Sequence, residues 1–141
     1  MDEAAVIYVP YANDESEPSV LEVVELNLNV LGFLPRMVKM QHQYSYGEFL
    51  NHLSYTETGP FIIVEHDCIP WPGAIQQILG CPEPNCSYGG TLQCAKITPT
   101  GHNLVPEKTI WGHCDARLWE GITSHMHLPE VSNINRSNMP R

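Results

Sequence analysis

The segment FIIVEHDCIPWPGAI, residues 61–75, places two carboxylates directly after a run of apolar residues. Glu65 and Asp67 are separated by one residue, His66. In an extended chain both carboxylates would point to one side and His66 to the other. Two such carboxylates repel each other unless a cation or a shared proton relieves them. Hard oxygen ligands favour Mg²⁺ or Mn²⁺ over zinc, so a divalent-metal site is expected, with a solvated surface turn as the alternative.

Two later segments carry further groups that could do chemistry. In IWGHCDARLWEGI, residues 110–122, Asp115 is followed at helical spacing by apolar residues, which predicts a helix with Asp115 at its inner end. The simpler interpretation of Asp115 is an acid stabilised near a helix N-terminus. The segment HMHLPE, residues 125–130, alternates, so His125 and His127 share one face of an extended segment and could contribute to a metal site.

The elements that must position these groups alternate along the first half of the chain. FIIV is apolar throughout, as a strand buried on both faces should be. The alternation predicts an α/β domain with three layers, α/β/α, and a mostly parallel central sheet, in which ligands bind beyond the carboxyl ends of the strands. The expected elements are strands at 4–10, 35–41 and 60–67 with helices at 19–32, 45–53 and 72–79, then short strands at 86–90 and 91–98, a helix at 110–122 and an extended segment at 125–134.

The composition limits the classes of function. A chain of 141 residues suits a single domain, expected over residues 1–135 with a flexible tail at 136–141. The formal net charge of -9 argues against a nucleic-acid binder, although a phosphate-bearing ligand could bind through a divalent cation. No apolar run approaches the ~18 residues of a membrane span, and the N-terminus lacks the basic start of a signal peptide. A cytoplasmic location and five reduced cysteines are therefore expected.

The order of these pieces resembles the GT-A fold nucleotide-sugar glycosyltransferases, in a very short form. The resemblance runs over about residues 4 to 135 and rests on a first strand of VPYAN type, the acid-x-Asp of VEHDCIPWPGAI, the Asp in WGHCDARLWEGI and the histidines of HMHLPEV. It implies a GT-A fold and an enzyme that moves a sugar from a UDP- or GDP-sugar donor to an acceptor hydroxyl. The acceptor is not implied. A Mn²⁺ or Mg²⁺ cofactor is implied.

The resemblance also assigns roles to individual residues. Asp67 would be the principal metal ligand, and Glu65 would contact the metal through water or the donor ribose. His127, or His125, would complete the metal shell. Asp115 would be the base that deprotonates the acceptor in an inverting transfer. The pocket for the nucleotide base would be lined by Pro10, Tyr11 and Asn13.

Two other functions are left open by the residues. A zinc-dependent hydrolase could use the Cys and His side chains of the chain, but no pair has the spacing of a known zinc motif. That set comprises His66, Cys68, His113, Cys114, His125 and His127. A non-catalytic sugar- or nucleotide-binding module is the other alternative, because little sequence remains for acceptor binding. Self-association into a homo-oligomer is also left open.

Overall fold

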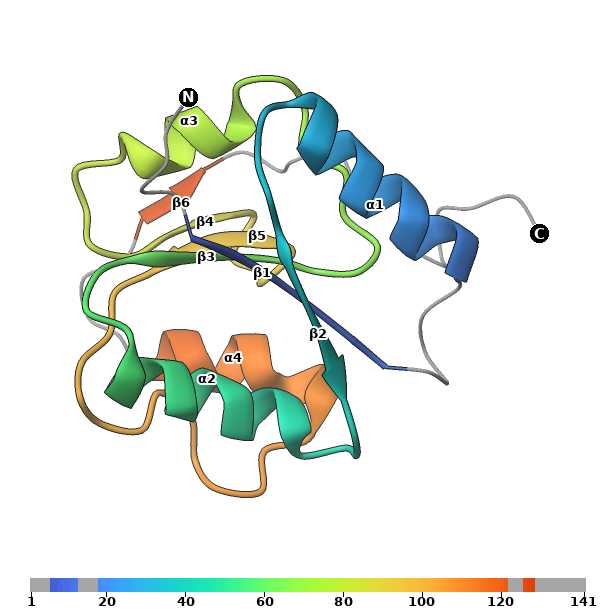
Figure 1. Ribbon diagram of the computed structural model, residues 1–141. Coiled ribbons are helices and arrows are strands. Elements are labelled where there is room, and N and C mark those ends of the chain that lie inside the picture. The colour runs from blue at the N-terminus through green and yellow to red at the C-terminus, as the bar shows by residue number, and fades with distance from the viewer. Residues whose placement is uncertain (1–5, 13–17, 122–125, 129–141) are drawn as a thin grey trace.

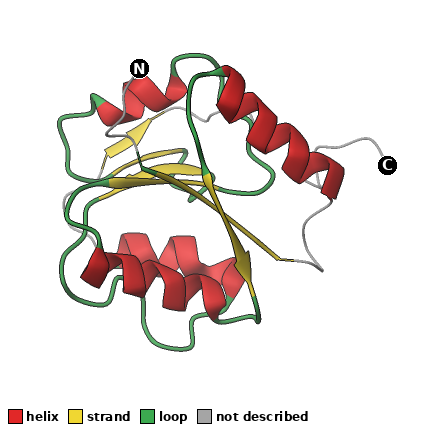
Figure 2. Cartoon of the chain, in the orientation of Figure 1, coloured by secondary structure: helices red, strands yellow, loops and turns green. Residues whose placement is uncertain are grey.

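The computed structural model describes residues 6–12, 18–121 and 126–128, with 18–19 and 126–128 described by their backbone alone (Figures 1 and 2). Strands and helices alternate through the first three strands, as the sequence predicts. The strands are β1 (Ile7–Ala12), β2 (Arg36–Met40), β3 (Phe61–Val64), β4 (Cys86–Tyr88), β5 (Cys94–Ile97) and β6 (Met126–Leu128). The helices are α1 (Pro18–Val30), α2 (Ser45–Thr56), α3 (Ala74–Leu79) and α4 (Cys114–Glu120), and a 3₁₀ turn, η1 (Trp111–His113), leads into α4.

The strands form one mixed sheet in the order β2-β1-β3-β5-β4-β6. Strand β1 is parallel to β2 and β3, and β4 is parallel to β6, whereas β5 is antiparallel to both of its neighbours. The α/β class is confirmed, but the sheet contains this reversed strand. The reason is the short connection 89–93 between β4 and β5, where Gly89 and Gly90 adopt φ of 67° and 72°. A turn this short can only join antiparallel strands.

Helices cover both faces of the sheet (Figure 1). Strand β3 is buried along its whole length, as its apolar run predicts, and its residues alternate between the two faces. Ile62 and Val64 join the core cluster that includes residues of α1 and α3. Phe61 and Ile63 join the cluster that includes residues of α2 and α4. The segment after β3 therefore leaves the sheet between two helical layers.

Within the described residues, none of the helices combines the length and the apolar character that crossing a membrane requires.

Candidate functional site

The carboxyl ends of β1 and β3 form a topological switch point. From β1 the chain moves to β2 on one side of it and then to β3 on the other, with Tyr8 opposite Ile63 in the β1–β3 register. Open α/β sheets bind ligands at this position. Pro10, which is buried, and Tyr11, which is half-buried, belong to the last part of β1. Asn13 lies outside the described residues.

The chain turns as soon as it leaves β3. The Glu65 amide donates to the Gln93 carbonyl at 2.9 Å, and the Cys68 amide donates to the Glu65 carbonyl at 3.0 Å. This turn returns the Cys68 side chain to the core, where it is fully buried. The extended geometry expected for residues 65–67 is therefore wrong, because strand periodicity ends at Val64.

The turn changes which side chains share a side. The Tyr46 hydroxyl, on α2, donates to Oε2 of Glu65 at 3.1 Å. The Tyr46 and Trp111 ring centroids are 4.7 Å apart, and the His66 and Trp111 centroids are 6.0 Å apart. Glu65 and His66 therefore both meet the Tyr46–Trp111 pair, and the expectation that they face opposite ways does not hold.

The environment of Glu65 strongly disfavours its charged form. Burial is the largest cause, and the nearby Asp67 carboxylate is the next; together they raise the pKa of Glu65 to about 8. The hydrogen bond from Tyr46 lowers this pKa, and the charge of Asp115 raises it. At neutral pH Glu65 is mostly protonated unless a cation approaches it. A carboxyl held in this state at a strand end is a candidate for chemistry.

Asp115, from a different part of the chain, lies near the Glu65 carboxyl. It lies in the first turn of α4, is half-buried, and its Oδ1 accepts from the Ala116 amide at 2.7 Å. The neighbouring Arg117 pairs with Glu120, Nη1 to Oε2 at 3.2 Å, on the exposed side of the helix. We refer to Glu65, Asp67 and Asp115 as the acidic edge. Its three members come from two segments, and two of them, Asp67 and Asp115, raise the pKa of the third, Glu65.

Contacts of α2 place the helix that carries Asp115. The Asn51 side chain accepts from the amides of Leu104 and Val105, at 2.7 Å and 3.0 Å, and donates to the Val105 carbonyl at 3.0 Å. A Cβ on Gly47 would lie 3.3 Å from the Thr109 carbonyl oxygen and from a Val105 methyl. The loop before α4 thus approaches α2 closely because residue 47 is a glycine.

Sequence reasoning also missed Tyr46 and Trp111. Tyr46 is fully buried, and the Trp111 amide donates to the Gln43 carbonyl at 3.0 Å, which ties η1 to the turn that precedes α2. The one available signal is position: each aromatic residue is the second residue of a predicted helix, 45–53 or 110–122. Nothing in that signal indicates a hydrogen bond to a carboxyl group 19 residues further along the chain.

The backbone of His127 lies away from the acidic edge. His127 pairs with Ser87, Ser87 pairs with Ala95, and Ala95 pairs with Ile63. Three strand spacings therefore separate His127 from β3, a distance of about 14 Å between backbones. His125 lies outside the described residues. A contribution of either histidine to the acidic edge stays a prediction.

Within residues 6–12, 18–121 and 126–128, no three His, Cys, Asp or Glu side chains are grouped so that they could hold a metal ion by themselves. The Cys and His set of the hydrolase alternative is divided by the sheet. Cys68 packs in the cluster with α1 and α3, and Cys114 packs in the cluster with α2 and α4. These two thiols cannot share one ion.

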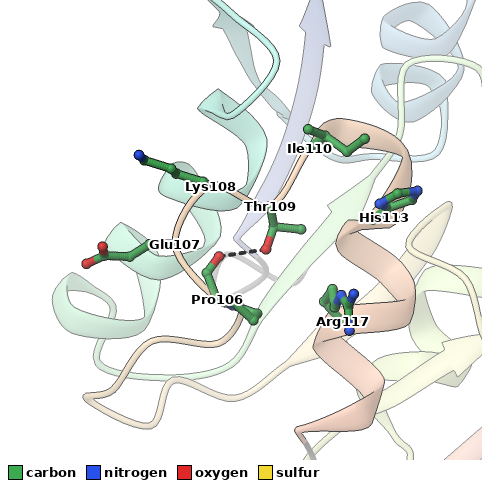
Figure 3. Close-up of a pocket in the computed structure, with 7 residues that line it drawn as sticks. All are labelled: Pro106, Glu107, Lys108, Thr109, Ile110, His113 and Arg117. Atoms are coloured by element: carbon green, nitrogen blue, oxygen red, sulfur yellow. Dashed lines mark hydrogen bonds between the residues drawn. The ribbon is translucent and has the colours of Figure 1, made fainter.

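A separate hollow of about 430 Å³ opens between the loop 106–110 and α4 (Figure 3). Thr109 Oγ1 donates to the Pro106 carbonyl at 2.6 Å, and Lys108 adopts a φ of 62°. The lining residues are Pro106, Glu107, Lys108, Thr109, Ile110, His113 and Arg117. His113 and Arg117 are about one helical turn apart and two residues on either side of Asp115, so Asp115 points to another face of α4. The hollow is distinct from the acidic edge.

No protein-family model matches the chain, and a search of curated proteins finds no match.

Proposed function

We propose that the protein is a metal-dependent glycosyltransferase that moves a sugar from a nucleoside-diphosphate donor to an acceptor hydroxyl with inversion. The observation that carries the proposal is the acidic edge beside the β1–β3 switch point, where Asp67 and Asp115 both raise the pKa of Glu65. In this proposal β2, β1 and β3 form the nucleotide-binding half of a shortened GT-A fold. The ends of β1 and β3 would then hold the donor between Tyr11 and Glu65.

The acidic edge fits a hard divalent cation. The mutual repulsion of Glu65 and Asp67 is relieved when a cation binds their oxygens. Mg²⁺ is usually held by one or two carboxylates, with water and substrate phosphates as its other ligands, so no third protein ligand is required. Asp67 would be the principal ligand, with Glu65 reaching the ion through water or the donor ribose. When bound, such an ion neutralises negative charge on the departing diphosphate.

Asp115 supplies the base in this proposal. The acceptor oxygen forms a bond to the anomeric carbon as the bond to the diphosphate breaks, and the hydroxyl proton passes to the Asp115 carboxylate. A positioned base contributes about 10² to 10⁴ in rate. Asp115 is suited to this because it comes from α4, whereas the carboxylates assigned to the donor come from the turn after β3. Donor and acceptor are thus served by separate elements.

The first experiment tests the donor and metal site. Thermal shifts are measured with UDP- and GDP-sugars, with and without Mn²⁺. We expect stabilisation that needs both nucleotide and Mn²⁺, and we expect Asp67→Asn to abolish it. Glu107→Gln, an exposed acid outside the acidic edge, is the control and should behave as the parent. If Asp67→Asn binds the nucleotide with Mn²⁺ as well as the parent does, Asp67 is not a metal ligand.

The second experiment separates a catalyst from a binding module. Turnover is followed as release of nucleoside diphosphate from the sugar nucleotide that binds best. Asp115→Asn should keep donor binding and lower turnover by about 10²-fold or more. If parent and variant both bind the donor and neither releases nucleoside diphosphate with any acceptor, the module is the better description. A product of retained anomeric configuration contradicts single displacement.

A further inference from the structure

Four of the five cysteines gather on the side of the sheet covered by α1 and α3. Cys68, Cys86 and Cys94 are buried in that core cluster, and Cys81 packs against it while half-exposed. Cys114 belongs to the opposite side. All five are free thiols. Cys81 is therefore the cysteine that a reagent in solution can reach first.

Lys96 connects Cys81 with Cys86. Cys86 is the first residue of β4 and stands opposite Lys96 in the β4–β5 register. The Lys96 side chain is buried, and its Nζ donates to the Cys81 carbonyl at 2.8 Å. The Cys81 thiol is also near enough to the Cys86 thiol to affect its pKa. Two thiols and an ammonium group thus meet where the loop Pro82–Asn85 closes.

The two thiols are unequal. Cys86 is fully buried, and burial, followed by the hydrogen bond and the charge of Cys81, raises the pKa of its thiol to about 12, although Lys96 acts in the opposite direction. Cys81 is thus the thiol able to attack an external partner, because the thiolate is the nucleophile and needs access. Once Cys81 is bound in a neutral disulfide, both effects of Cys81 on the pKa of Cys86 disappear. Burial still raises this pKa, and the Lys96 ammonium still lowers it.

We propose that Cys81 and Cys86 form a thiol–disulfide pair that reacts with low-molecular-weight disulfides such as glutathione disulfide. The Cys81 thiolate attacks one sulfur of the reagent, a mixed disulfide forms, and one glutathione leaves as its thiol. The Cys86 sulfur, after losing its proton, attacks the Cys81 sulfur, and the second glutathione leaves as its thiol. The protein loses two electrons and two protons, and the reagent gains them.

The test uses reduced full-length protein in glutathione buffers of defined ratio, quenched with N-ethylmaleimide. Chymotryptic cleavage after Leu79 and Tyr88 gives a peptide that holds Cys81 and Cys86 without the other cysteines. We expect this peptide from the parent to lose two hydrogens and to carry no glutathione.

The variants assign the steps. Cys86→Ser, or Cys86→Ala if the serine variant does not fold, should stop at one glutathione on Cys81. Cys81→Ser should leave Cys86 reduced, and Cys114→Ser, on the other face, should match the parent. A lasting glutathione adduct on the parent, or oxidation of Cys86 in Cys81→Ser at the parental rate, would overturn the proposal.

Discussion

Ionisation of Glu65 should make the protein less stable as the pH rises. The pKa of Glu65 is about 8 in the folded chain, against an ordinary value of 4.5. The folded state therefore holds this proton where the unfolded state has lost it, so stability falls with rising pH. The contribution is fully present below about pH 4.5 and is lost as the pH rises through 8. At 1.36 kcal/mol per pKa unit, its upper limit is about 5 kcal/mol, which solvent near the half-buried side chain reduces.

Glu65→Gln isolates this effect, because glutamine keeps the shape and still accepts the hydrogen bond from Tyr46. Urea unfolding followed by tryptophan fluorescence at pH 5, 7 and 9 gives the free energy of unfolding. Parent and variant should agree within about 1 kcal/mol at pH 5, and the variant should be more stable at pH 9 by a few kcal/mol. Glu25→Gln, on the exposed side of α1, should show no such change with pH. Parallel pH profiles for the parent and Glu65→Gln would refute the reasoning.

Three further substitutions follow from the same contacts. Tyr46→Phe removes the hydrogen bond that lowers the pKa of Glu65, so this pKa should rise. In the urea series, the free energy of unfolding should then continue to fall up to a higher pH than in the parent. Asp67→Asn removes a like charge, so without added metal the pKa of Glu65 should fall and the loss of stability should shrink, as carboxyl titration by NMR would show. Asn51→Ala leaves the amides at 104–105 without their acceptor and should cost roughly 2 to 4 kcal/mol of unfolding free energy, with Asn51→Asp, which keeps the acceptor, costing less.

The features that the sequence predicts are those with a local cause. The uninterrupted apolar run FIIV identifies β3 as fully buried and puts Glu65 and Asp67 just beyond its end. Pairing between distant segments has no such local signal. The direction of β5, the bond from Tyr46 to Glu65 and the nearness of Asp115 to Glu65 each depend on how separate segments pack.

The turn after β3 shows where periodicity stops being informative. The sequence predicts that the strand continues through residues 65–67, but the return of Cys68 to the core requires the chain to bend. The position of His127 depends on its register in β6, which no spacing in HMHLPE specifies.

The hydrogen bonds from Asn51 to the backbone of residues 104–105 affect how the fold opens locally. The same helix carries Tyr46, which holds Glu65, and Asn51, which holds the loop that leads to Asp115. We therefore expect amide groups on α2, on the loop at 104–105 and on α4 to open as one cooperative unit and to exchange their hydrogens with solvent at similar rates. We therefore expect Asp115 and Glu65 to lose their places together, because the loop before α4 and the Glu65 carboxyl are both held by α2.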